Sequence, residues 1–188
     1  LFTSTNEVKS YMSIGSSAGA THQRPTANAD GSYPFDVGIA TIPQANASNK
    51  KVISQGPSLC VLQKPNQNPQ EVVASWLFVK YLTTTVEFQA EFSMESGYVP
   101  VIKSVSDNTE YKKFIDGANG GTNIAALSAK VCLEQEEAYY TSPAFDGSSK
   151  ARDQVGALLA KCLSANDGGD VDAMIKKAFE DAIEECEY

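Results

Sequence analysis

The sequence predicts an α/β or α+β protein, with short strands in the first third of the chain and helices after it. Residues 10–62 contain short runs of β-branched and apolar residues separated by Gly, Pro and Asn. From residue 69 onward the apolar spacing changes to the helical period. The chain has 188 residues, of which 42% are apolar and 20% charged, so it can bury a core of ordinary size.

The predicted strands are short, and polar connectors separate them. They cover residues 10–14, 35–42, 52–55 and 58–62. The first is followed by the small-residue run Gly15-Ser16-Ser17-Ala18-Gly19-Ala20, whose backbone amides could approach a ligand closely. Residues 21–32 and 44–51 are rich in Asn, Pro, Ser and Lys, which predicts loops.

Two helices are predicted between residues 69 and 96. The first begins near Pro69 and places five apolar residues on one face, which predicts a core stripe that includes the only tryptophan: Val72, Val73, Trp76, Leu77 and Tyr81. Three consecutive threonines at 83–85 interrupt it. The second helix reaches Ser96, and Gly97 is expected to end it in the left-handed conformation.

The stretch after Gly97 is a candidate binding feature. Tyr98 leaves the helix end with an aromatic face and a phenolic tip, which suits a ligand that is half apolar and half hydroxyl. Pro100 favours an extended exit. The plainer alternative is an ordinary loop with Tyr98 as half-buried filler.

The remainder of the chain is predicted to be mainly helical. Helices are expected at residues 110–116, ended by Gly117, and at 123–137. Residues 142–149 are a predicted loop. Two amphipathic helices follow, around 151–162 and 171–183, separated by a turn at 166–169.

Composition and cysteine spacing exclude several classes of protein. The net charge of −8 argues against nucleic acid as a partner. Four cysteines without a C-x-x-C spacing, together with one histidine, give no expected metal site, and no motif indicates a cofactor. Four buried free thiols are favoured, with a Cys162–Cys186 disulfide as the lesser alternative. The start at Leu1, without an initiator Met or a signal sequence, leads us to expect a piece of a longer protein.

One motif points to catalysis. Gly15-Ser16-Ser17-Ala18-Gly19 fits the G-x-S-x-G elbow of α/β-hydrolases, with Ser17 as nucleophile. Such a triad needs a distant downstream histidine, but the only histidine is His22, in the same loop. A serine esterase therefore remains an alternative function, as does a plain interaction domain.

Binding-type residues near loops form the larger set of candidates. Hydroxyls, exposed amides and a few aromatics suit a sugar or polyol. The candidates are Ser16, Ser17, Gly19, Gly56, Ser58, Tyr98, Tyr139, Tyr140, Phe145 and Arg152.

Five pieces in order resemble the C-terminal half of family 1 extracellular solute-binding proteins, the receptors of carbohydrate ABC importers. They are Met12-Ser13-Ile14-Gly15-Ser16-Ser17-Ala18-Gly19-Ala20, Val37-Gly38-Ile39-Ala40-Thr41-Ile42-Pro43, Ser54-Gln55-Gly56-Pro57-Ser58-Leu59-Cys60-Val61, Ala74-Ser75-Trp76-Leu77-Phe78-Val79-Lys80-Tyr81-Leu82 and Ser96-Gly97-Tyr98-Val99-Pro100-Val101. The resemblance covers residues 8–188.

The resemblance implies a two-lobed periplasmic-binding fold that closes on its ligand. Residues 1–45 and 102–188 would belong to the C-terminal lobe, and residues 46–101 to the N-terminal lobe. The expected ligand-binding residues are Ser16, Ser17, Gly19, Gly56, Ser58, Tyr98, Tyr140, Phe145 and Arg152. The Tyr98 phenol would face the gap between the lobes.

The same resemblance implies a receptor without catalytic residues. Its partners would be a sugar, oligosaccharide, polyol or sugar phosphate and an ABC permease in the membrane. The protein would be a monomer in an extracytoplasmic location, held by an upstream lipidated cysteine or free in the periplasm.

Overall fold

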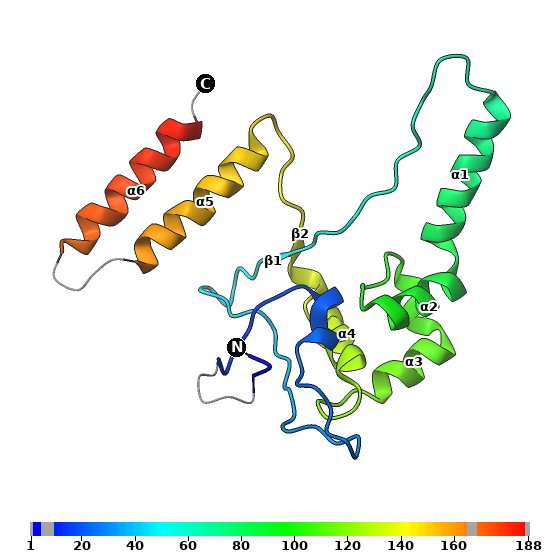
Figure 1. Ribbon diagram of the computed structural model, residues 1–188. Helices are drawn as coiled ribbons and strands as arrows, with labels where there is room; N and C mark the ends of the chain where they lie inside the picture. The colour runs from blue at the N-terminus through cyan, green and yellow to red at the C-terminus, as the bar shows by residue number, and fades with distance from the viewer. Residues whose placement is uncertain (1, 5–9, 165–168, 187–188) are drawn as a thin grey trace. The chain divides into compact units, whose positions relative to one another are not determined.

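The computed structural model describes residues 2–4, 10–164 and 169–186. The chain divides into two compact units, Leu1–Tyr140 and Thr141–Tyr188. Figure 1 shows a chain built mainly of helices with one two-stranded sheet. The mixture of helix and strand agrees with the predicted class.

The first unit contains short 3₁₀ helices (η), four α-helices and both strands. In chain order they are η1 (Ser17–His22), β1 (Val52–Ile53), α1 (Pro69–Thr84), α2 (Val86–Ser96), η2 (Lys103–Asp107), α3 (Thr109–Asp116), α4 (Ile124–Glu134), η3 (Glu136–Ala138) and β2 (Tyr139–Tyr140).

Local sequence explains the helix boundaries. The side chains of Asn68, Asn108 and Asn123 each accept a hydrogen bond from a backbone N–H in the first turn of α1, α3 and α4, respectively. Thr85 separates α1 from α2 in an extended conformation. Gly97 ends α2 with φ +75°, which confirms the predicted left-handed cap.

The sheet pairs β1 with β2 in parallel. Val52 lies opposite Tyr139 and Ile53 opposite Tyr140, and the Ser54 N–H donates to the Tyr140 carbonyl at 2.8 Å. The strand predicted at 52–55 is thus confirmed for its first two residues.

The other three predicted strands, at residues 10–14, 35–42 and 58–62, are wrong. The chain there has no regular strand, and most of the apolar side chains face water: Tyr11 is 90% exposed and Leu62 is 82% exposed. A β-like sequence forms a strand only where a neighbour pairs with its backbone along several residues, and in the described part of the chain no segment forms such a ladder with these three.

The core of the first unit lies where α2, η2 and α3 meet. Ala90, Val105 and Tyr111 are buried, with Tyr111 only 1% exposed. Partly buried apolar side chains pack around them: Val86, Met94, Ile102, Phe114, Ile115 and Leu133.

A second contact ties the N-terminal loops to the turn before α4. The Val37 N–H donates to the Gly120 carbonyl at 3.3 Å, and Val37 is buried. The Arg24 guanidinium reaches the Gly121 carbonyl at 3.4 Å and lies 4.0 Å from the centre of the Tyr33 ring. Segments about a hundred residues apart in the chain are thereby held together.

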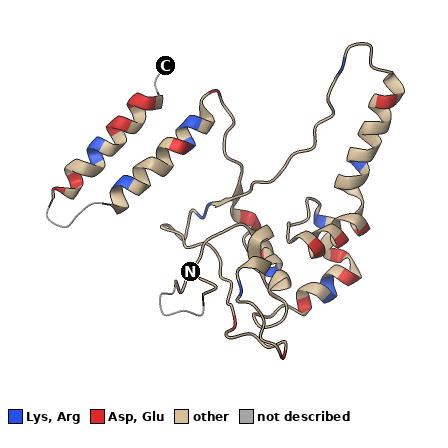
Figure 2. Cartoon of the chain, viewed as in Figure 1, with Lys and Arg blue, Asp and Glu red and all other residues tan. Residues whose placement is uncertain are grey.

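Helix α1 does not form the predicted core stripe. None of its residues is buried, and Trp76 is 58% exposed, so its assignment to the core is wrong. Figure 2 shows a helix with almost no charge, and its only charged residues are Glu71 and Lys80. The helical prediction holds, but no described element covers the apolar face around Trp76, and only Tyr81, near the end of α1, packs on a ring of α2.

The second unit is a helical hairpin of α5 (Ser148–Leu163) and α6 (Val171–Cys186). The two helices run antiparallel side by side (Figure 1), with Leu158 and Ala178 buried. Both predicted helices are confirmed. The turn predicted at 166–169 lies mostly outside the described residues.

The cysteines are all free thiols, as favoured, but they are not buried. Cys60 is exposed, and Cys132, Cys162 and Cys186 are half-buried. Cys162 lies in the last turn of α5 and Cys186 ends α6, and both are free thiols, so the structure does not form the alternative disulfide.

Candidate functional site

The structure brings two of the predicted binding segments together. The backbone of Ser17 and Ala18, in η1, lies against Gly97, at the end of α2. A Cβ atom at Gly97 would stand 3.1 Å from the Ser17 carbonyl oxygen and 3.4 Å from the Ala18 Cα. Gly97 therefore provides both the left-handed turn and the close approach of the Gly-Ser-Ser segment to the residue before Tyr98.

The two adjacent serines differ in their surroundings. The side chain of Ser16 is exposed, while its carbonyl accepts the Gly19 N–H at 3.0 Å. Ser17 is half-buried, and its side chain lies close enough to the Cys132 thiol on α4 to affect the pKa of that thiol. Burial raises the pKa of the Cys132 thiol, which keeps it neutral beside Ser17. Ser16, more than Ser17, has its hydroxyl available to a ligand.

Tyr98 is neither in the core nor free in solvent. It is 37% exposed, and its ring stacks on Phe92 with centroids 6.2 Å apart and an interplanar angle of 17°. Phe92 in turn stacks on Phe88 at 5.9 Å, and Phe88 contacts Tyr81 at 5.5 Å. Tyr98 thus ends a row of aromatic rings along α1 and α2.

Sequence reasoning missed two polar residues behind Tyr98. Ser93 is 2% exposed, and its hydroxyl donates to the Tyr98 carbonyl at 2.5 Å. Gln89 is 7% exposed, and its side-chain oxygen accepts the Val101 N–H at 3.0 Å. The sequence carried one signal for their burial. The two residues are four positions apart, so they lie on the same face of the helix, and the apolar Ala90 lies beside that face.

A further group of candidates lies along the small sheet. Tyr140, in β2, is 41% exposed and lies opposite Ile53. Because the strands are parallel, the chain leaves β1 at the same edge toward Gly56 and Ser58, which are both exposed. Tyr139 points differently: its hydroxyl donates to the Cys132 carbonyl at 2.7 Å, and burial is the main cause that raises the pKa of its phenol.

Phe145 and Arg152 belong to the second unit, whereas all the other candidates belong to the first. Phe145 is 59% exposed, and the side chain of Arg152, on α5, is exposed. Gly19 is half-buried inside η1, and no atom lies within 4 Å of the place a Cβ would occupy there.

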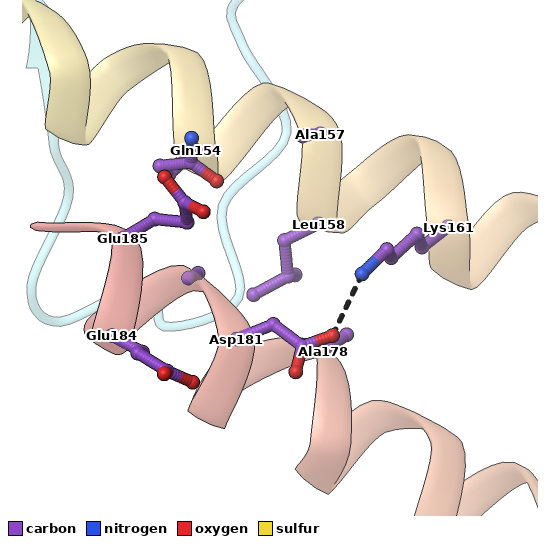
Figure 3. A pocket seen from close by; sticks show the side chains of 9 residues that line it. Gln154, Ala157, Leu158, Lys161, Ala178, Asp181, Glu184 and Glu185 are labelled. Carbon is purple, nitrogen blue, oxygen red and sulfur yellow. Dashed lines mark hydrogen bonds and ion pairs between the residues drawn. The ribbon is translucent and has the colours of Figure 1, made fainter.

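A groove of about 360 Å³ lies between α5 and α6. Figure 3 shows its polar side chains, with Lys161 bonded to Asp181 at 2.9 Å. The hydrogen bonds from Lys161 and then Lys177 lower the pKa of the Asp181 carboxyl. Neither Phe145 nor Arg152 lines this groove, so it does not coincide with a predicted site.

The arrangement offers no support for the hydrolase alternative. Ser17 and His22 are the two ends of η1, and five steps of a 3₁₀ helix span roughly 10 Å, beyond hydrogen-bond reach. Among the described residues, no group of three or more His, Cys, Asp or Glu side chains could hold a metal ion.

No helix in the described part of the chain combines the length and apolar character needed to span a bilayer.

Replacing Gly97 with alanine should lower the free energy of unfolding by roughly 2 kcal/mol. Left-handed backbone costs a side-chain-bearing residue about 1–2 kcal/mol, and the new Cβ adds the close contact with Ser17. Gly31→Ala is the matched control, because Gly31 has φ +82° with no atom within 4 Å of its Cβ position. Urea unfolding should show a larger loss for Gly97→Ala; equal losses would mean that the contact with Ser17 contributes nothing.

Comparison with known protein families gives a match over the first part of the chain. A family model described as bacterial extracellular solute-binding protein matches residues 4–116, more than half of the chain. The match includes both Ser16-Ser17 and Gly97-Tyr98, the segments that the structure places in contact. No curated protein and no solved structure matches the chain significantly.

Proposed function

The chain belongs to the family of bacterial extracellular solute-binding proteins, and we propose that it binds a sugar or related polyol and delivers it to an ABC importer. Family membership implies a small-molecule ligand, an ABC transporter as partner and an extracytoplasmic location. The family is generally non-enzymatic, in keeping with the expectation of a receptor.

The observation that carries the choice of ligand class is the contact between the Gly-Ser-Ser segment and Gly97-Tyr98. The Ser16 hydroxyl is exposed, and the backbone that follows it packs on Gly97. Gly97 directly precedes Tyr98, whose ring is partly exposed. Aromatic faces pack on the C–H surface of a sugar, and hydroxyls bond to its polar edge. Gly19, Gly56, Ser58, Tyr140, Phe145 and Arg152 complete the proposed ligand-binding set.

The proposed mechanism is closure of two lobes on the ligand. Residues 1–45 and 102–188 would form one lobe and residues 46–101 the other, with the Tyr98 phenol facing the gap. A ligand that touches both lobes stabilises the closed form, which the permease then recognises. The protein would act as a monomer, either tethered by a lipidated cysteine or free in the periplasm.

A ligand screen tests this function. The full-length protein is mixed with monosaccharides, maltose, glycerol and glycerol 3-phosphate, and unfolding is followed by temperature. A ligand at about 100 times its Kd should add about 2.7 kcal/mol of stability. If none of these compounds raises the melting temperature, the proposed ligand class is wrong.

Tyr98→Ala should weaken binding of the sugar found in this screen by about fivefold, because an aromatic contact of this kind contributes roughly 1 kcal/mol. Isothermal titration calorimetry measures the change, and Tyr98→Phe separates the contribution of the ring from that of the phenol. Phe179→Ala, on α6, is the control, since Phe179 is also half exposed but is not a candidate. Equal affinities for Tyr98→Ala and Phe179→Ala would remove Tyr98 from the site.

A further inference from the structure

Two buried polar side chains lie on one face of α2. Gln89 and Ser93 are four residues apart, one turn of the helix, and they are 7% and 2% exposed. Ala90, beside them, is 2% exposed, so this is the face that packs into the core. An amide and a hydroxyl at such positions cost free energy unless each is hydrogen-bonded.

Both side chains bond to the backbone just after Gly97. The Ser93 hydroxyl donates to the Tyr98 carbonyl at 2.5 Å, and the Val101 N–H donates to the Gln89 side-chain oxygen at 3.0 Å. The Gln89 amide nitrogen also donates to the Leu82 carbonyl at 2.5 Å, in the last turn of α1. The exit segment is therefore tied to α2 at both ends and, through Gln89, to α1.

Among the described residues, the segment between these two bonds has few other hydrogen bonds to fix it. Pro100 has no N–H to donate, and residues 98–101 have no strand partner in the described structure. The Tyr98 N–H donates to the Ser96 hydroxyl at 3.3 Å, a longer bond on the exposed side of the helix. The direction in which the chain leaves Gly97 thus depends on Gln89 and Ser93.

These hydrogen bonds fix the position of Tyr98. Its carbonyl is held by Ser93 while its ring rests on Phe92, so its backbone and its side chain are fixed from two neighbouring positions of one helix. We propose that Gln89 and Ser93 are positioning residues, which hold the Tyr98 ring at a fixed angle to α2 by clamping the backbone at Tyr98 and Val101. The clamp itself does not depend on the proposed function; only its expected effect on ligand affinity rests on that function.

Ligand-free measurements test the clamp itself. Gln89→Met keeps the side-chain length and removes both hydrogen bonds, and Ser93→Ala removes the hydroxyl, whereas Ser93→Thr restores it. Gln70→Met and Ser75→Ala, exposed positions on α1, are the matched controls. Amide hydrogen exchange is read at Val101, and fluorine NMR of 3-fluorotyrosine-labelled protein reads the Tyr98 ring, assigned with Tyr98→Phe.

The expected result is local. Gln89→Met should speed exchange of the Val101 amide at least tenfold, and Ser93→Ala should move or broaden the Tyr98 resonance, with the wild-type signal returning in Ser93→Thr. The Tyr33 resonance, from a ring that packs on Arg24 and not on Ser93, and the control variants should keep their wild-type behaviour. Unchanged Val101 exchange and Tyr98 signal, or a uniform loss of protection over α2 and α3, would overturn the proposal.

Calorimetry with the sugar found in the screen separates the two proposals. If both hold, Gln89→Met and Ser93→Ala each weaken binding, and neither weakens it further when Tyr98 is already alanine. If the clamp measurements succeed but no sugar binds the wild-type protein, the positioning role stands and the proposed function fails. If the sugar binds but Gln89→Met and Ser93→Ala bind it as wild type, Tyr98 needs no positioning and the inference fails.

Discussion

Replacing Tyr111 with alanine is expected to lower the free energy of unfolding by about 3–5 kcal/mol, the range for removing a buried aromatic side chain. Tyr111 is 1% exposed and joins α3 to Ala90 of α2 and Val105 of η2. Its ring also lies 6.0 Å from that of Phe114. The truncation leaves a cavity that all three elements line, so its cost is not confined to α3.

Tyr111→Phe should cost far less, about 1 kcal/mol or below, because only the hydroxyl contact with Ser93 at 3.5 Å is lost. Burial already raises the pKa of the Tyr111 phenol, so the group is neutral over the ordinary pH range. Urea unfolding followed by circular dichroism measures both changes. Tyr11→Ala is the exposed control; a comparable loss there would mean that the cluster around Tyr111 is not the core.

The second large effect is expected at Gly120, where alanine should cost about 3 kcal/mol. A Cβ there would overlap the Val37 carbonyl oxygen and lie 3.1 Å from its carbonyl carbon. Both neighbours are backbone atoms, which cannot rotate away as the end of a side chain can. The substitution must therefore separate Val37 from the turn before α4 and break its hydrogen bond to Gly120.

Gly38→Ala is the control for Gly120→Ala, because Gly38 follows Val37 directly and has no atom within 4 Å of its Cβ position. Chemical unfolding should separate the two variants clearly. Similar stabilities would show that the N-terminal loops do not pack on residues 119–123 in solution.

Helix boundaries were predictable because their signals are local. Pro69, the three threonines, Gly97 and the apolar spacing act within a few residues, and α1 to α6 form close to where they predict, except that α4 ends at Glu134 and not at residue 137. Strands were less predictable, since Tyr11 and Leu62 lie in runs that look like strands but find no strand to pair with among the described residues. The prediction that Trp76 is buried failed for the same reason. An apolar stripe on one helix does not reveal whether another element packs on it.

The individual residues of the candidate site were predictable from the sequence, but the contacts between them were not. Ser16 and Tyr98 were chosen from small-residue and glycine–aromatic patterns, which are visible over a few residues. The contact of Gly97 with Ser17 joins positions 80 residues apart, and no local pattern indicates such a pair. Gln89 and Ser93 went unnoticed because polar residues in a helix usually face water, and only tertiary packing shows that these do not.

The uncovered face of α1 has a practical consequence. Trp76 is the only tryptophan of the chain, and it lies at 58% exposure in the middle of that face. Its fluorescence therefore reports on one surface alone, with emission to the red while water covers the indole and to the blue once an apolar surface replaces the water. The protein thus carries an intrinsic probe for whatever packs on α1, and no label has to be introduced.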